Sequence, residues 1–107
     1  MAISKIYELT DGTKYLIYRC PACNQLEYIP YQGGTEHKGP VWKFNGNLES
    51  PSLQPSVRHF VPDEKGRVKE TICHYYLTNG HINYCTDSPH AFRGQTVPIP
   101  QLTSDEP

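Results

Sequence analysis

The sequence lacks the features that would place it in several large functional classes. Its 107 residues carry a formal net charge of -1, so it has no basic excess of the kind that duplex-binding proteins use to neutralise phosphates. No apolar run approaches the roughly 20 residues that span a bilayer. The first residues do not join a basic segment to an apolar one, as a secretory signal does. Nucleic acid and membrane are therefore disfavoured as partners, and we expect a cytoplasmic protein.

The sequence also lacks the composition that long helices require. Ten prolines and eight glycines interrupt helices, whereas eight tyrosines and many β-branched residues favour strands. Hydrophobic residues make up only 36%, which allows one modest core. We predict a single all-β domain over residues 1–100, built mostly of antiparallel hairpins with little helix. A flexible acidic tail is expected over residues 101–107.

Turn-forming residues divide the chain into short strands. Asp11-Gly12 separates two β-rich segments, residues 3–9 and 14–19, and is a hairpin signal. Residues 24–30 alternate like a further strand. Two prolines within residues 50–56 exclude regular structure there. That segment is expected to be a rigid loop that caps a sheet edge or lines a pocket.

Four cysteines are the most informative residues of the chain. Cys20 and Cys23 enclose Pro21 in a Cys-x-x-Cys turn of the kind found in zinc knuckles. A redox motif would need a helix after Cys20, which residues 24–30 do not favour. In a reducing compartment, cysteines are more often metal ligands than disulfides. The sequence therefore predicts a zinc-ribbon-like site that staples the β domain.

The other two cysteines flank a turn, and the length of that turn decides which ligands meet. A three-residue loop ending at Gly80 pairs Leu77 with His81 and places Cys73 directly opposite Cys85, on one face of the hairpin. We favour this register. The zinc ligands that it predicts are Cys20, Cys23, Cys73 and Cys85.

A two-residue loop is the alternative. It shifts the pairing by one residue and places Cys85 on the same face as His74. The predicted ligands are then Cys20, Cys23, His74 and Cys85. Four protein ligands make a closed tetrahedral site, and closed zinc sites are structural rather than catalytic.

A second polar cluster is expected beside the hairpin. His74 faces away from the thiolates in the favoured register, and Asp87 and His90 lie just past the end of the second strand. Histidine and aspartate can hold a metal with an open position or transfer protons. Alternatively, residues 87–89 form a capped turn and His90 is a packing or surface residue. A Ser-His-Asp triad from Ser56 or Ser88 is disfavoured, because no nucleophile elbow is present.

The motifs occur in an order that resembles a family of small uncharacterised Cys/His proteins of tailed phages, prophages and bacteria. They are Cys20-Pro21-Ala22-Cys23, Trp42-Lys43-Phe44-Asn45-Gly46, Pro51-Ser52-Leu53-Gln54-Pro55-Ser56, Cys73-His74, Asn79-Gly80 and Asp87-Ser88-Pro89-His90-Ala91-Phe92-Arg93-Gly94-Gln95-Thr96-Val97. Some members carry the label "ammonia monooxygenase", which nothing in this sequence supports. Others resemble components encoded beside bacterial ubiquitin-like conjugation genes, for which a zinc-dependent peptidase role has been suggested.

This resemblance implies a phage or bacterial origin, a bacterial cytoplasm as location and a metal-binding Cys/His domain. His74, Asp87 and His90 match the family's Cys-His and Asp-Ser-x-His positions. Some relatives carry cysteine at the position of Ser88 and an apolar residue at that of Cys85. This departure puts Cys85 in question as the fourth ligand and leaves His74 or His90 as alternatives.

Two functional interpretations follow. The first is a zinc-stapled interaction module that engages a host or phage protein, which accounts for the four cysteines and the lack of an evident nucleophile. The alternative is a zinc-dependent hydrolase or peptidase in which His74, Asp87 and His90 act as open-site ligands or acid/base groups. The two differ in whether those three side chains converge in a pocket with room for water.

Overall fold

The computed structural model describes residues 3–22 and 24–102 of the chain. Over these residues it contains only strands, and the expected all-β fold with antiparallel pairing is confirmed. The described part of the chain contains no helix that is long and apolar enough to cross a membrane. The strands are β1 (Lys5–Glu8), β2 (Lys14–Cys20), β3 (Gln25–Gln32), β4 (Lys43–Phe44), β5 (Leu53–Gln54), β6 (Val57–Pro62), β7 (Val68–Thr78), β8 (His81–Tyr84) and β9 (Thr96–Pro98).

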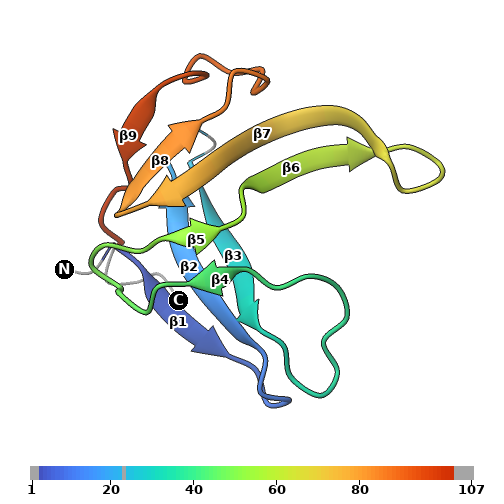
Figure 1. Ribbon diagram of the computed structural model, residues 1–107, viewed down its shortest axis with the longest axis vertical. Helices are drawn as coiled ribbons and strands as arrows, with labels where there is room; N and C mark the ends of the chain where they lie inside the picture. Colours follow the sequence, from blue (N-terminus) through green and yellow to red (C-terminus); the bar gives the residue numbers. More distant parts are fainter. Residues whose placement is uncertain (1–2, 23, 103–107) are drawn as a thin grey trace.

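These strands form three antiparallel sheets, in the orders β1-β2-β3, β4-β5 and β6-β7-β8-β9. In Figure 1 the β6–β7 hairpin extends away from the rest of the molecule, and β5 runs between β4 and β7. The predicted hairpin at Asp11-Gly12 joins β1 to β2. Its turn is held by Asp11, whose carboxylate accepts hydrogen bonds from the Thr13 N–H (3.0 Å) and hydroxyl (2.8 Å).

The core lies where β2, β5, β7 and β8 meet, and buried tyrosines dominate it. The Tyr18 and Tyr75 hydroxyls share a hydrogen bond, and burial raises the pKa of both phenols well above the ordinary value. Both therefore stay neutral and act as apolar bodies with a satisfied polar tip. The other residues of this cluster are Leu16, Cys20, Ile29, Leu53, Val57, Cys73, Leu77, Ile82, Tyr84 and Ile99.

The β7–β8 hairpin turns through two residues, so the three-residue loop expected from the sequence is wrong. Thr78 pairs with His81, and Asn79 (φ 49) and Gly80 (φ 75) both have left-handed backbones. Two positive φ angles define a type I′ turn, whose twist matches that of the strands it joins. Asn-Gly is the preferred pair for this turn, because asparagine tolerates the left-handed region and glycine has no Cβ.

This register decides what each face of β7 carries. Cys73 and Tyr75 point into the core, whereas His74 and Tyr76 lie on the other face of the strand. Cys85 donates its backbone N–H to the His74 carbonyl at 2.8 Å and is therefore the neighbour of His74. Cys73 and Cys85 consequently lie on opposite faces, as in the two-residue alternative.

Residues 50–56, expected to lack regular structure, do so only in part, because Leu53–Gln54 form β5. The loop before β5 docks on the β7–β8 turn: Gly80 donates its N–H to the Pro51 carbonyl (2.9 Å) and Asn79 donates its N–H to Ser52 Oγ (2.8 Å). Leu102, placed by the sequence in the tail, is buried with 3% of its surface exposed. The remainder of that predicted tail, residues 103–107, lies outside the described residues.

Replacing Gly80 with Ala should lower the free energy of unfolding by about 1 kcal/mol or more. A Cβ there would lie 3.2 Å from Ile3 Cδ1, on a backbone with φ +75. Thermal unfolding should show a Tm lower by about 4–8 °C. Gly46→Ala is the matched control, because Gly46 has φ +82 and nothing within 4 Å of an added Cβ. A Gly80→Ala protein that melts no lower than this control would contradict the docked type I′ turn.

Candidate active site

Three neighbouring strands bring polar side chains together on the outer face of the β6-β7-β8-β9 sheet. Arg58 on β6 pairs directly with His74 on β7, and Cys85 follows the end of β8 beside His74. Directly paired residues point to the same face of a sheet. Ser56 immediately precedes β6, and Asp87 lies two residues after Cys85. Strand pairing therefore gathers residues that are up to 31 positions apart in the sequence.

Ser56, His74 and Asp87 form a continuous hydrogen-bonded chain. Ser56 Oγ lies 3.0 Å from His74 Nε2. On the other side of the ring, His74 Nδ1 lies 3.0 Å and 3.1 Å from the two carboxylate oxygens of Asp87. The histidine side chain is largely covered, with 17% of its surface exposed, whereas that of Asp87 is 47% exposed. The arrangement is that of a serine nucleophile, a histidine base and an orienting carboxylate.

The two shorter contacts of Nδ1, to the Asp87 carboxylate, assign the ring proton to that nitrogen over the longer contact with Arg58 Nη2 at 3.3 Å. A carboxylate only accepts hydrogen bonds, so Nδ1 donates to Asp87. In the neutral ring Nε2 then has a free lone pair, which accepts the Ser56 hydroxyl proton. The pKa of Asp87 is lowered, first by the hydrogen bond from His74 and also by the nearby charge of Arg58. Arg58 donates to Asp87 Oδ2 at 3.1 Å, which keeps the carboxylate ionised and aimed at the ring.

The backbone around the serine is anchored on both sides. The Trp42 indole donates its Nε1–H to the Ser56 carbonyl at 3.1 Å. Leu53 before the serine and Val57 after it are both buried in the core with 2% of their surfaces exposed. These contacts hold the segment between β5 and β6 so that the Ser56 side chain faces His74.

Ser88, the other serine considered for a triad, has a different role. It is buried, with 1% of its surface exposed. Its hydroxyl accepts the His74 N–H at 2.9 Å and donates to the His74 carbonyl at 2.8 Å. Both hydrogen bonds go to backbone, so Ser88 fixes the main chain that carries the histidine and is not placed to attack a substrate.

His90 does not join His74 and Asp87, so the three-residue cluster expected from the sequence forms only in part. Its Nε2 lies 3.3 Å from Cys73 Sγ, and its Nδ1 accepts the Phe92 N–H at 3.2 Å. The ring packs edge-on against Tyr84, with centroids 4.7 Å apart. His90 therefore belongs to the core side of β7.

The predicted metal-binding cysteines divide between the two faces. Cys20 and Cys73 are fully buried in the core, and the Tyr84 hydroxyl lies 3.1 Å from Cys20 Sγ. Cys23 lies outside the described residues. Cys85 lies on the opposite face from Cys73, and the ligand sets themselves stay predictions.

Cys85 belongs to a group on the outer face that can hold a metal ion. One ligand atom from each of His74, Cys85 and Asp87 lies within 4.8 Å of the other two. Burial and the neighbouring charge of Asp87 raise the pKa of the Cys85 thiol. The thiol is therefore not activated as a nucleophile.

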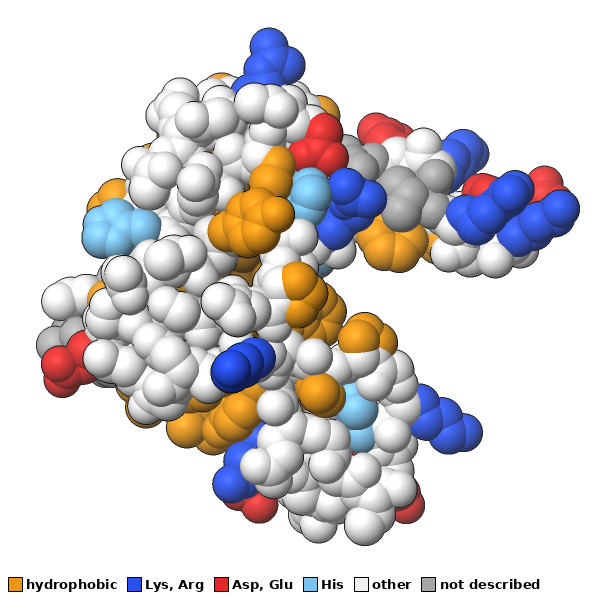
Figure 2. Space-filling view, viewed as in Figure 1, with side chains coloured by type: hydrophobic (Ala, Val, Ile, Leu, Met, Phe, Trp, Pro, Cys, Tyr) orange, Lys and Arg blue, Asp and Glu red, His pale blue; other side chains and the backbone are white. Residues whose placement is uncertain are grey.

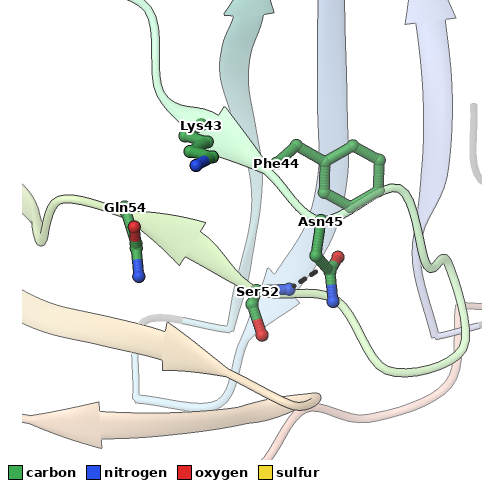
Figure 3. A pocket seen from close by; sticks show the side chains of 5 residues that line it. All are labelled: Lys43, Phe44, Asn45, Ser52 and Gln54. Carbon is green, nitrogen blue, oxygen red and sulfur yellow. Dashed lines mark hydrogen bonds between the residues drawn. The ribbon is translucent and has the colours of Figure 1, made fainter.

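One face of the molecule is hollowed. Figure 2 shows a notch between the protruding β6–β7 hairpin and the lobe below it, and a histidine lies between acidic and basic side chains near the base of the hairpin. A separate open pocket of about 170 Å³ is lined by Lys43, Phe44, Asn45, Ser52 and Gln54. In Figure 3 Asn45 and Ser52 lie side by side, joined by a 3.1 Å hydrogen bond, while Phe44 points away from Lys43. The last lining residue, Gln54, precedes Ser56 by two positions.

The comparison with protein families gives one result. Residues 2–85 match the model of a family described as bacterial ubiquitination-like system serine protease (BubE). No curated protein and no solved structure matches the chain. The link to bacterial ubiquitin-like conjugation that the resemblance implies is thereby confirmed, whereas the phage origin stays a prediction.

This match corrects the first functional interpretation. A family of serine proteases indicates an enzyme and not a zinc-stapled interaction module. The first interpretation is therefore wrong. The match favours the alternative, a hydrolase or peptidase. The sequence disfavours Ser56 because it shows no nucleophile elbow. In the structure Ser56 lies in a short connection between two strands, a setting that has no local sequence signature.

The carboxyl of Asp87 should titrate below its ordinary value of 3.8, as a carbon-detected NMR titration would show. Since the folded-state pKa is lowered, this group stabilises the fold above the unfolded pKa, and the contribution is lost as the pH falls through the folded value. In His74→Ala the midpoint should rise, because His74 is the largest cause of the shift. An unchanged midpoint in that variant would mean that the ring does not donate to Asp87.

Proposed function

Because the chain belongs to the BubE family, we propose that it is a serine protease in which Ser56 is the nucleophile, His74 the general base and Asp87 the orienting carboxylate. The observation that carries this proposal is the pair of contacts on opposite sides of one imidazole. Nε2 is 3.0 Å from the Ser56 hydroxyl oxygen and Nδ1 is 3.0 Å from an Asp87 oxygen. Two such contacts are what a base needs to be both oriented and close to the proton it removes.

The reaction follows from these contacts. Ser56 Oγ attacks the scissile carbonyl carbon while its proton moves to His74 Nε2. The imidazolium then donates that proton to the leaving amine, which departs and leaves an acyl group on Ser56. A water that gives its proton to Nε2 hydrolyses this ester and restores the serine. Asp87 remains ionised throughout, and its negative charge stabilises the transient imidazolium.

The substrate side is proposed from the family and the surface. The family name specifies a bacterial ubiquitination-like system, so the proposed substrate is a protein of such a system in the bacterial cytoplasm. The open pocket on the β4–β5 hairpin lies two residues upstream of Ser56. It supports binding of a substrate side chain beside the scissile bond, with the Lys43 ammonium favouring an acidic or polar group.

Replacing Ser56 with Ala should lower kcat by about a thousandfold or more, because the variant has no oxygen to form the acyl intermediate. Binding should be little affected, because the methyl group fits the space that the hydroxyl leaves. The measurement is hydrolysis of an activated acyl ester such as p-nitrophenyl acetate, followed by assays on peptides.

Ser50→Ala is the matched control for this experiment. Ser50 lies in the preceding loop, between β4 and β5, and its hydrogen bonds with Asn45 and Asn47 use its backbone. This variant should keep the wild-type rate. If Ser56→Ala and Ser50→Ala were equally active, Ser56 would not be the nucleophile.

We also propose a zinc ion bound away from the triad, on the core side of β7. Its proposed ligands are Cys20, Cys23, Cys73 and His90. Cys20 and Cys73 are buried, and His90 Nε2 already lies 3.3 Å from Cys73 Sγ. Two or three thiolates with an imidazole are a donor set that zinc prefers. Such an ion would tie the end of β2 to β7 beneath the catalytic face, and the triad chemistry does not pass through it.

Replacing Cys20 with Ser should remove this ion and lower the Tm sharply, because binding free energy of such a site contributes to folding. Native mass spectrometry should show one zinc on the wild type and none on the variant. Cys85→Ser is the control and should keep the ion, since Cys85 lies on the other face. Wild-type protein that carries no zinc, and melts alike with and without a chelator, would rule out this site.

A further inference from the structure

We propose that His74, Cys85 and Asp87 form a second, reversible zinc site, and that a zinc ion bound there switches off the Ser56 nucleophile. This inference rests on the proposed function, because it concerns regulation of the same catalytic group. It assigns a purpose to the thiol of Cys85, which the protease chemistry does not use.

The donor set and its geometry fit the ion. One imidazole nitrogen, one sulfur and one carboxylate oxygen lie within 4.8 Å of one another, and these are the three ligand types that zinc takes in proteins. Zinc–ligand distances of about 2.0–2.3 Å place ligand atoms roughly 3.5–4 Å apart around one ion, so only small side-chain movements are needed. Asp87 is exposed and Cys85 half-buried, which gives a solvated ion access to the site.

The fold places these donors together without help from the metal. Cys85 is held by a 2.8 Å hydrogen bond from its N–H to the His74 carbonyl. The Ser88 N–H in turn donates to the Cys85 carbonyl at 3.1 Å, which turns the chain so that Asp87 faces His74. The three donors are therefore ordered by backbone contacts. Their side chains would lose little conformational entropy when an ion binds.

Zinc bound to this group is incompatible with general-base catalysis by His74. If the ion takes Nδ1, the proton of the neutral ring must move to Nε2, which then cannot accept the Ser56 proton. If the ion takes Nε2, it displaces the serine hydroxyl directly from its 3.0 Å contact. In both cases the hydroxyl loses its proton acceptor, and the Cys85 thiol proton is released to solvent as the thiolate binds.

The neighbouring arginine makes the site weak enough to be reversible. Arg58 Nη2 lies 3.1 Å from Asp87 Oδ2 and 3.3 Å from His74 Nδ1, so its positive charge stands next to the position of the ion. Zinc must displace the guanidinium or bind against its repulsion. With three protein ligands and this competition, the site is expected to bind zinc less tightly than a closed four-ligand site.

The test is the rate at which a fluorophosphonate labels Ser56, measured across a titration with zinc chloride. The protein is the full chain as purified, dialysed so that only tightly held metal remains. In the wild type, zinc should slow labelling to near zero, and a chelator should restore the rate. In Cys85→Ser, the labelling rate without zinc should be unchanged. The zinc concentration for half-inhibition should rise by about tenfold or more, because a ligand is lost.

His81→Asn serves as the matched control. It removes an exposed histidine from β8 that lies outside the group, so this variant should show the wild-type zinc response. Metal binding is followed independently of labelling in Ser56→Ala, where cobalt should give a thiolate-to-cobalt absorption band that Cys85→Ser in the same background abolishes.

The outcomes separate this inference from the proposed function. The regulatory site is overturned if zinc does not slow labelling of the wild type, or if it slows labelling equally in Cys85→Ser. Either result leaves the protease proposal standing. Absence of Ser56 labelling in wild type without added zinc overturns the protease proposal, and the inhibition falls with it. Zinc inhibition that depends on Cys85 but not on His81 supports the inference.

Discussion

The pairing register of β7 with its two neighbours is the constraint on which the site depends. The type I′ turn at Asn79-Gly80 sets Thr78 against His81, and strand alternation then assigns every side chain of β7 to one face. A slip of one residue would exchange the two faces. It would bring the thiol of Cys73 to the outer surface and carry the imidazole of His74 into the core.

The same turn also positions Ser56, the proposed nucleophile. Its two N–H groups donate to the Pro51 carbonyl and Ser52 Oγ, which ties the loop leading to β5 onto the hairpin that carries His74. Ser56 lies two residues after the end of β5, and the Trp42 indole donates a hydrogen bond to its carbonyl. The Ser56–His74 contact is thus fixed by backbone geometry at both ends. Fixed geometry of this kind is what distinguishes a catalytic pair from an incidental surface hydrogen bond.

Much of the fold could be predicted from the sequence, because its signals are local. Asp11-Gly12 and Asn79-Gly80 each specify a turn through the φ angles that their residues tolerate, and the composition excludes long helices. The register of β7–β8 is the exception among these turns. A three-residue loop and a two-residue loop both accommodate Asn79-Gly80, and the structure has the two-residue type I′ turn that Asn-Gly prefers.

The site was harder to predict because its members meet only in three dimensions. The sequence indicates His74 and Asp87, since both lie close to the hairpin. It disfavours Ser56 because no nucleophile elbow is present, and the pairing of β6 with β7 that brings Ser56 to His74 is visible only in the structure. The face of Cys85 depends on the register, so a one-residue error reverses it. His90 lies in the loop after β8, where strand alternation does not apply, and that loop carries it to Cys73 and Tyr84 on the core side of β7.

The claim that Ser56 is an activated nucleophile is tested most directly by identifying the residue that a fluorophosphonate modifies. The wild-type chain should gain one adduct, located on Ser56 by peptide mapping, and His74→Ala should gain none under the same conditions. A wild-type chain that stays unmodified, or that is modified at Ser88 or another serine while Ser56 stays free, would contradict the account.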